Sequence, residues 1–235
     1  MFDLFSDPVK VAQQLEILKS ELGFALWETM YSLILEVIFA YVIGLPLGVL
    51  LVTGEKDGIR PLPGWLMKII NWVINILRSV PFLILMIIVL PLSKILVGTK
   101  VGTIATIPPM VIAAFPLVAR MVESSLRELD QGVIEAAQSM GASTWQIVAK
   151  VMLPEATPSL ISGGTITLGT ILGYGAMSAA LGGGGLGKLA INYGYYNFKF
   201  IVMWAAVIGL ILLVQIFQSA GTRLAAKSDK RLRGR

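Results

Sequence analysis

The chain has 235 residues, of which 56% are hydrophobic and only 14% are charged, with a net charge of +5 and a mean hydropathy of +0.80. Soluble domains carry about 25% charged residues, so this composition excludes an ordinary globular protein and indicates a chain that crosses a membrane. Cys and His are absent from the sequence, which excludes disulfides, Cys or His metal sites, a Cys nucleophile and a His general base.

Apolar stretches of the ~20 residues that a helix needs to cross a bilayer recur along the chain. Ahead of the first stretch, residues 9–22 predict a short amphipathic helix that either lies at the membrane surface or extends the first span. The predicted fold is an all-α integral membrane protein with five spans, at about residues 24–52, 66–92, 101–122, 159–181 and 200–220. The corresponding division is an N-terminal segment (1–23), a transmembrane domain (24–222) that includes a polar loop (123–158), and a basic tail (223–235).

Lys and Arg are distributed unequally between the two sides of these spans. With the N-terminus outside, twelve of them fall on the inner side, six fall on the outer side, and Arg78 lies within a span. Because the inner loops of membrane proteins carry the excess of basic residues, we predict an N-out, C-in topology. The same placement, beside apolar segments, argues against nucleic acid as a partner. The inner residues are Lys56, Arg60, Lys68, Arg120, Arg127, Lys150, Arg223, Lys227, Lys230, Arg231, Arg233 and Arg235, and the outer ones are Lys10, Lys19, Lys94, Lys100, Lys188 and Lys199.

The polar loop predicts two short helices joined at a glycine. Asp130 can cap the first helix, and Gly141 supplies the left-handed position that ends it. Ser143 or Thr144 can start the second helix, and Thr157 is expected to cap the fourth span. The first helix, about residues 132–140, is some 14 Å long and has small side chains. It is either a knob for the groove of a cytoplasmic partner or an ordinary amphipathic connector.

The run Glu135-Ala136-Ala137, then Gly141, then Leu153-Pro154 resembles the signature loop of the permease subunits of bacterial ABC importers, with Val151 where the family usually has Ile. The resemblance implies a type I permease fold. It also implies that Glu135, Ala136, Ala137, Gly141, Leu153 and Pro154 couple this chain to an ATPase subunit. The permease itself is then not an enzyme.

Similarity to the methionine-uptake branch of these permeases runs nearly from end to end. The segments that carry it are Trp27-Glu28-Thr29, Gly44-Leu45-Pro46-Leu47-Gly48, Arg78-Ser79-Val80-Pro81-Phe82, Val97-Gly98-Thr99, Gly173-Tyr174-Gly175-Ala176-Met177, Gly182 to Gly187 and Tyr193-Gly194-Tyr195. This resemblance implies a homodimer in the bacterial inner membrane, two cytoplasmic ATPase subunits that bind ATP and Mg²⁺, and an extracytoplasmic substrate-binding lipoprotein. No cofactor is expected in this chain. L-methionine, and often D-methionine, is the implied substrate, while another amino acid or a glycine-betaine-type osmolyte stays open.

Polar residues line one side of the fourth predicted span, and such a stripe faces protein or water more often than lipid. We therefore expect this span to line the transport pathway, through Thr170, Tyr174 and Ser178, with Met177 as a hydrophobic gate. A Met in a membrane helix is also a common packing residue. Arg78 is either a pathway residue or a helix-end arginine at the cytoplasmic interface.

Two glycine patterns invite other interpretations. Gly44 and Gly48 are four residues apart, as in tightly packed membrane helices. The run from Gly182 to Leu189 nearly matches a phosphate-binding loop. However, Leu189 stands where such a loop needs Ser or Thr, and a helix rather than a strand precedes it. We expect a flexible turn at the extracytoplasmic entrance instead.

Two other classes of function compete with the importer permease. A self-sufficient channel or secondary transporter would fit the spans, but repeat halves are not visible and the loop suggests docking. A membrane enzyme lacks a catalytic constellation. Glu36, an acid in the middle of an apolar stretch, has no role that the sequence assigns.

Overall fold

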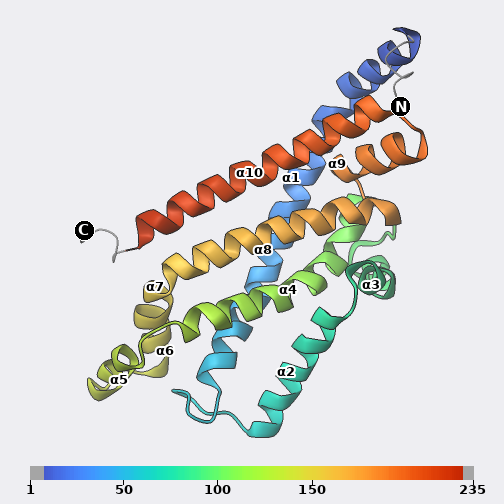
Figure 1. The fold of residues 1–235 in the computed structure, drawn as a ribbon. Helices are drawn as coiled ribbons and strands as arrows, with labels where there is room; N and C mark the ends of the chain where they lie inside the picture. The colour runs from blue at the N-terminus through green and yellow to red at the C-terminus, as the bar shows by residue number, and fades with distance from the viewer. Residues whose placement is uncertain (1–7, 230–235) are drawn as a thin grey trace. The chain divides into compact units, whose positions relative to one another are not determined.

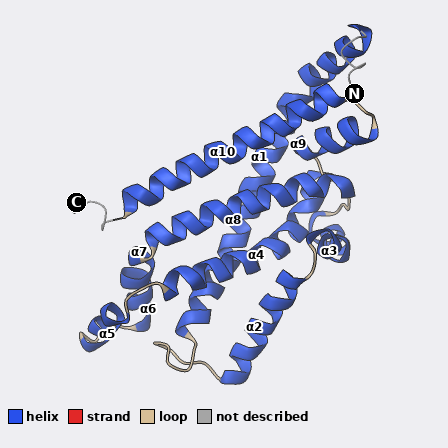
Figure 2. Ribbon diagram, viewed as in Figure 1, coloured by secondary structure: helices blue, strands red, loops and turns tan. Residues whose placement is uncertain are grey.

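A computed structural model of the chain describes residues 8–229; the start of the predicted N-terminal segment (1–7) and the end of the basic tail (230–235) lie outside this range. Within residues 8–229 every regular element is helical, and short loops join the helices (Figure 2). The predicted all-α class is confirmed.

Four helices of the described chain are long and apolar enough to cross a membrane, and a fifth span arises if the broken pair α2–α3 counts as one. The four are α1 (Pro8–Thr53), α4 (Thr103–Arg127), α8 (Thr157–Ser178, continued by a 3₁₀ turn, Ala179–Leu181) and α10 (Phe200–Ser228). The pair is α2 (Gly64–Ser79) and α3 (Phe82–Val97). The shorter elements are α5 (Gln131–Ser139), α6 (Thr144–Ile147), a π-helical turn (Val148–Met152), α7 (Leu153–Glu155), α9 (Gly185–Lys188) and a π-helical segment (Leu189–Tyr196) (Figure 1).

Two expected elements take a different form. The range 66–92 contains two helices rather than one, because Pro81 offers no N–H and holds Val80 in an extended conformation (φ −77°, ψ 128°). The amphipathic segment 9–22 continues without a break into the first span, since α1 begins at Pro8.

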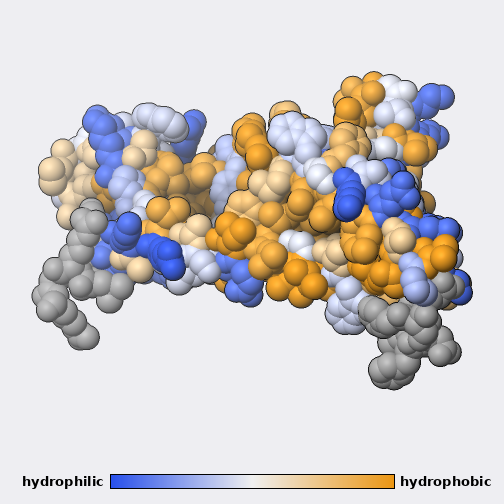
Figure 3. Space-filling view, turned by 90° about the horizontal axis from the view of Figure 1, so that it is seen from above, coloured by the Kyte–Doolittle hydropathy of each residue, from blue (hydrophilic) through white to orange (hydrophobic). Residues whose placement is uncertain are grey.

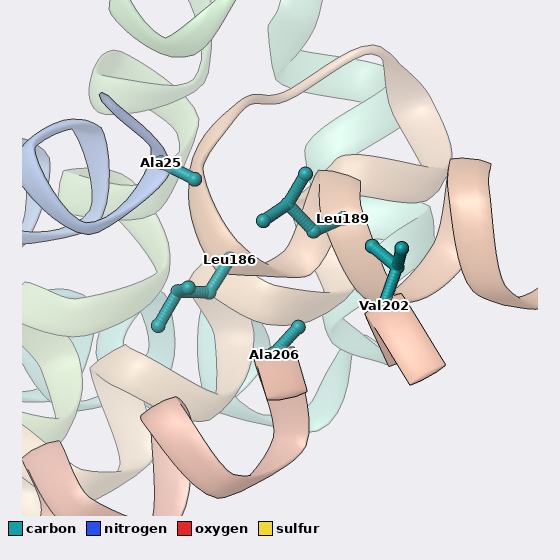
Figure 4. Close-up of a cluster of buried hydrophobic side chains, with 5 residues drawn as sticks. All are labelled: Ala25, Leu186, Leu189, Val202 and Ala206. Carbon is teal, nitrogen blue, oxygen red and sulfur yellow. The ribbon is translucent and has the colours of Figure 1, made fainter. Parts of the chain in front are cut away.

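The chain divides into two compact units, each of which is described by itself. The first contains residues 8–38, 81–111 and 169–216, and the second contains residues 39–80, 112–168 and 217–229. In the first unit, α9 packs against the beginning of α10 and against α1. Figure 4 shows the buried side chains at this contact, which are Ala25, Leu186, Leu189, Val202 and Ala206.

The core of the second unit joins α1, α2 and α4. Leu51, Met67, Ile74 and Ala119 are buried together. A Cβ on Gly44 would lie 2.7 Å from the Phe115 carbonyl oxygen, and one on Gly48 would lie 2.6 Å from that of Ala119. Tight helix packing at these glycines, as the sequence suggested, is therefore confirmed.

The surface carries many large apolar side chains. On the face seen in Figure 3, hydrophobic residues cover broad areas and hydrophilic residues gather in separate groups. Exposed Val, Ile, Leu, Phe and Trp side chains occur on α1, α2, α3 and α10, as for helices whose outer faces meet lipid.

Candidate functional site

The first helix of the polar loop forms as its capping residues predict. Asp130 is the N-cap of α5, and its carboxylate accepts a hydrogen bond from the Gly132 N–H at 2.8 Å. Gly141 follows the helix with φ = +78°, the left-handed conformation that ends helices. Of the α5 side chains only Ile134 is buried, so the rest of this short helix is free to contact a partner.

The second helix begins with a capping box. The Ser143 hydroxyl accepts a hydrogen bond from the Gln146 N–H, and the Gln146 side-chain oxygen accepts one from the Ser143 N–H at 2.8 Å. Ile147 and Met152 are buried and anchor this segment. The loop is thus held to the second unit by one face while its other face stays exposed.

A π-helical turn, Val148–Met152, links the second helix to α7, which carries Leu153 and the exposed Pro154. The helical path then continues almost directly into α8. The cap expected at Thr157 is wrong, because its hydroxyl donates a hydrogen bond back to the Leu153 carbonyl at 3.0 Å. The loop and α8 are thus joined by a nearly continuous helical path.

Between α5 and α6 lies a hollow of about 550 Å³. Small residues of α5 line one side, and the lining also includes two exposed apolar side chains, Met140 (85% exposed) and Val133 (44%). Exposed apolar side chains next to a hollow are typical of a protein-binding surface. The lining residues are Val133, Ala136, Ala137, Met140, Gly141, Ala142, Gln146, Lys150 and Val151. Glu135 lies exposed on the same helix, outside the hollow.

An ion-pair network lies where α4 meets this loop. Arg127, at the end of α4, donates hydrogen bonds to Glu55 at 2.5 and 3.1 Å and to the buried Glu123 at 2.9 and 3.2 Å. Arg120 donates to Glu123 at 2.6 Å and to the side-chain oxygens of Asn71 and Asn75 on α2, each at 2.8 Å. The sequence counts both arginines only toward the topology, because their partners outside α4, which are Asn71, Asn75 and Glu55, lie 45 to 72 residues away.

The predicted pathway residues of α8 belong to the first unit. The Tyr174 ring stacks on that of Phe82, with centroids 4.3 Å apart, and the Ser178 hydroxyl donates to the Gly175 carbonyl at 2.7 Å. Met177 is 43% exposed, and Thr170 lies two turns before it. Arg78 belongs to the second unit, exposed in the last turn of α2. Among residues 8–229 no group of acidic side chains is suited to hold a metal ion.

The glycine-rich segment after α8 is held in place rather than flexible, which corrects the sequence-based expectation. The Glu28 carboxylate accepts hydrogen bonds from the Thr103 hydroxyl at 2.8 Å and from the Gly185 N–H at 2.9 Å. The Thr29 hydroxyl oxygen accepts a third, from the Leu186 N–H at 2.9 Å. We call this arrangement the α1 clasp. A Cβ on Gly187 would lie 2.5 Å from the Ala176 carbonyl oxygen, so α9 packs directly on α8.

Several known proteins are similar to this chain over most of its length. A probable D-methionine transport system permease protein of Vibrio cholerae is 45% identical over 94% of this chain and 98% of its own length. The methionine import system permease protein of Bacillus subtilis is 46% identical over 70% of this chain and 74% of its own. A solved inward-facing methionine ABC transporter contains a chain that is 41% identical, covers 89% of this chain and 96% of that one, and superposes with a TM-score of 0.86.

A family model described as "binding-protein-dependent transport system inner membrane component" matches residues 44–233, most of the sequence. The match includes the two-helix loop, the ion-pair network and α8, which are the features that the geometry singles out. The chain therefore belongs to the family of binding-protein-dependent transport system inner membrane components.

Proposed function

We propose that this chain is the membrane-spanning subunit of an ATP-driven importer of methionine. Its α5–α6 hollow is the observation that carries the proposal: a small-faced helix with a rigid turn exposes apolar side chains beside a hollow, as a docking surface for a partner subunit does. The names of relatives that are 45% and 46% identical support methionine as the substrate. The permease supplies the gated path, and a separate ATPase subunit binds ATP and Mg²⁺.

We assign the coupling role to Glu135, Ala136, Ala137 and Gly141, with Leu153 and Pro154 passing the motion on to α8. Small side chains on α5 allow a partner's backbone to come close. The Arg127 network supports this role, because it joins the end of α4, where the loop begins, to Glu55 and to α2.

We further propose that two copies of the chain assemble and that α8 lines the path between them. Only 17% of the most apolar stretch of α8 is buried within the chain, against 11% for α10. However, α8 has the lowest hydropathy of the four long helices and α10 has the highest. A helix that is not covered by its own chain and is poorly suited to lipid must face another protein surface or water. A second copy of the chain supplies the protein surface, and the path between the two copies holds the water. Met177, exposed on this helix, is the proposed gate, with Tyr174, Thr170, Ser178 and Arg78 along the path.

The proposed topology is N-out and C-in, in the inner membrane of a bacterium, with an extracytoplasmic binding protein delivering the substrate. The excess of basic residues on the inner side supports this orientation. A reporter fused after Arg235 is expected to behave as cytoplasmic.

The test is ATP-dependent uptake of labelled L-methionine into vesicles that contain the chain together with its ATPase and binding protein. D-methionine, other amino acids and glycine betaine serve as competitors. Uptake that needs ATP, and competition by methionine alone, is the expected result. Ala137→Trp should abolish uptake by blocking the docking hollow, whereas Ile208→Trp, at an exposed apolar position of α10, should not. Uptake by the chain without any ATPase would show a stand-alone transporter and would refute the proposal.

A further inference from the structure

Glu36 is the acid to which the sequence assigns no role. It lies in α1 among apolar residues, and its side chain is 2% exposed within a single chain. Its carboxyl group has no hydrogen bond or ion pair with any residue of the described range, 8–229. Glu28, two turns earlier on α1, shows the contrast, because the α1 clasp supplies it with two hydrogen-bond donors.

The Glu36 side chain lines a small cavity of about 20 Å³ in the first unit. Four helices and the glycine-rich segment meet around this cavity, which we call the Glu36 cavity. Its walls are rich in hydroxyl groups, which come from one face of α1, from the start of α4 and from the end of α8. The hydroxyl-bearing residues of the wall are Thr29, Ser32, Thr103, Thr106 and Ser178.

Each of these hydroxyl groups donates its proton in a hydrogen bond to a group other than Glu36. A hydroxyl carries one proton and two lone pairs, so after donating once it can only accept. The five bonds run from Thr29 to the Ala25 carbonyl (2.9 Å), from Ser32 to the Thr29 carbonyl (3.3 Å), from Thr103 to Glu28 (2.8 Å), from Thr106 to the Thr103 carbonyl (2.7 Å) and from Ser178 to the Gly175 carbonyl (2.7 Å). The side chains of the wall thus offer the Glu36 cavity lone pairs and no donor.

We propose that the Glu36 cavity is a binding site for one water molecule and one proton, with the proton carried by the Glu36 carboxyl group. A buried carboxylate without a hydrogen-bond donor or a cation is strongly unfavourable. In its acid form the same group becomes the donor that the side chains of the wall lack. The cavity has room for a single water molecule, which can pass the hydrogen bond on to the hydroxyl oxygens.

This site joins α1 and α4 to a particular part of α8. The α8 residues of the wall are Leu172, Gly175, Ala176 and Ser178, and the last three flank Met177 in the sequence. A neutral, fully hydrogen-bonded Glu36 therefore holds the segment that we propose as the gate. This step alone rests on the proposed function; the water and proton site does not.

Infrared spectroscopy of the full-length chain in lipid vesicles tests the protonation directly. A carboxylic acid has a C=O stretching band that carboxylates lack, and ¹³C-labelled glutamate shifts this band. We expect one shifted acid band at pH about 7.5, which disappears in Glu36→Gln and persists in the matched control Glu28→Gln. Absence of an acid band in the labelled wild-type protein overturns the proposal, whether or not the variants fold.

Thermal stability provides a second, independent measurement. Glutamine has the shape of the protonated acid and carries its own donors, so Glu36→Gln should melt within a few degrees of the wild type. Replacing Na⁺ by choline should change neither melting temperature. A wild-type melting temperature that falls on removal of Na⁺, with Glu36→Gln unaffected, would show an ionised Glu36 that binds a metal cation, and the proposal would be overturned.

Discussion

The turn at Gly141 allows the coupling role to be tested without disturbing the packing of the protein. Gly141 has φ = +78°, and a Cβ at this position would meet no other atom within 4 Å. The effect of Gly141→Val is therefore purely a backbone effect. A residue with a Cβ in the left-handed region costs about 1–2 kcal/mol, and a β-branched residue lies at the upper end. About 2 kcal/mol corresponds to a roughly 30-fold shift away from the native turn, since 1.4 kcal/mol is tenfold.

We expect Gly141→Val to insert and assemble normally but to lose most of its ATP-coupled uptake, because α5 no longer holds its orientation. Uptake and ATP hydrolysis should be measured together in reconstituted vesicles, with assembly checked by size-exclusion chromatography. Gly141→Asn should retain more activity, because Asn tolerates the left-handed conformation. Gly23→Val is the matched control: Gly23 lies within helix α1, also has open space around it, and differs from Val in helix propensity by less than about 1 kcal/mol. Normal coupled uptake by Gly141→Val would refute the coupling role of this turn.

Three further predictions concern other parts of the chain. Glu28→Ala removes the acceptor of two hydrogen bonds of the α1 clasp, and a hydrogen bond to a charged acceptor is worth about 1.5–3 kcal/mol. The melting temperature of this variant should therefore fall by several degrees. An unchanged melting temperature would mean that the clasp does not contribute to stability. Gly48→Leu should destabilise strongly, by about 3 kcal/mol or more, because the new side chain meets the Ala119 carbonyl oxygen and the Val122 Cβ, which are both fixed by the backbone of α4. Gly23→Leu should be tolerated in the same melting assay. Met177→Ala should leave assembly intact and raise substrate leak through vesicles without ATP, and equal leak in a folded variant would exclude a gate at this residue.

Local structure could be read from the sequence wherever the cause lies within a few residues. Asp130, Gly141 and Ser143 set the ends of α5 and α6, because caps and left-handed glycines act on their own turn of helix. The break at Val80–Pro81 was also visible in principle. The hydropathy of residues 66–92 concealed it, because an apolar run says nothing about a missing N–H.

Contacts between distant residues could not be predicted in this way. Arg120 and Arg127 read as topology signals, and their contacts with Glu55 and with α2 appear only once the helices pack. The sequence shows two separate motifs, Trp27-Glu28-Thr29 and Gly182 to Gly187. A pattern in one sequence does not show that residues 157 positions apart, such as Glu28 and Gly185, meet in the α1 clasp. The environment of Glu36 was hidden for the same reason, since its walls come from four helices.

The separation of the clasp residues has a consequence for how the chain is made. Membrane helices emerge from the ribosome in order, so Glu28 and Glu36 enter the membrane long before α9 exists to complete the surroundings of either. During this interval the two acids depend on water or on the insertion machinery for partners. Glu28 and Glu36, which lie in the first sixth of the chain, are therefore enclosed only when the last third of the chain has been made. A chain that stops before Gly185 keeps only one of the three hydrogen bonds of the clasp, the one from Thr103 to Glu28.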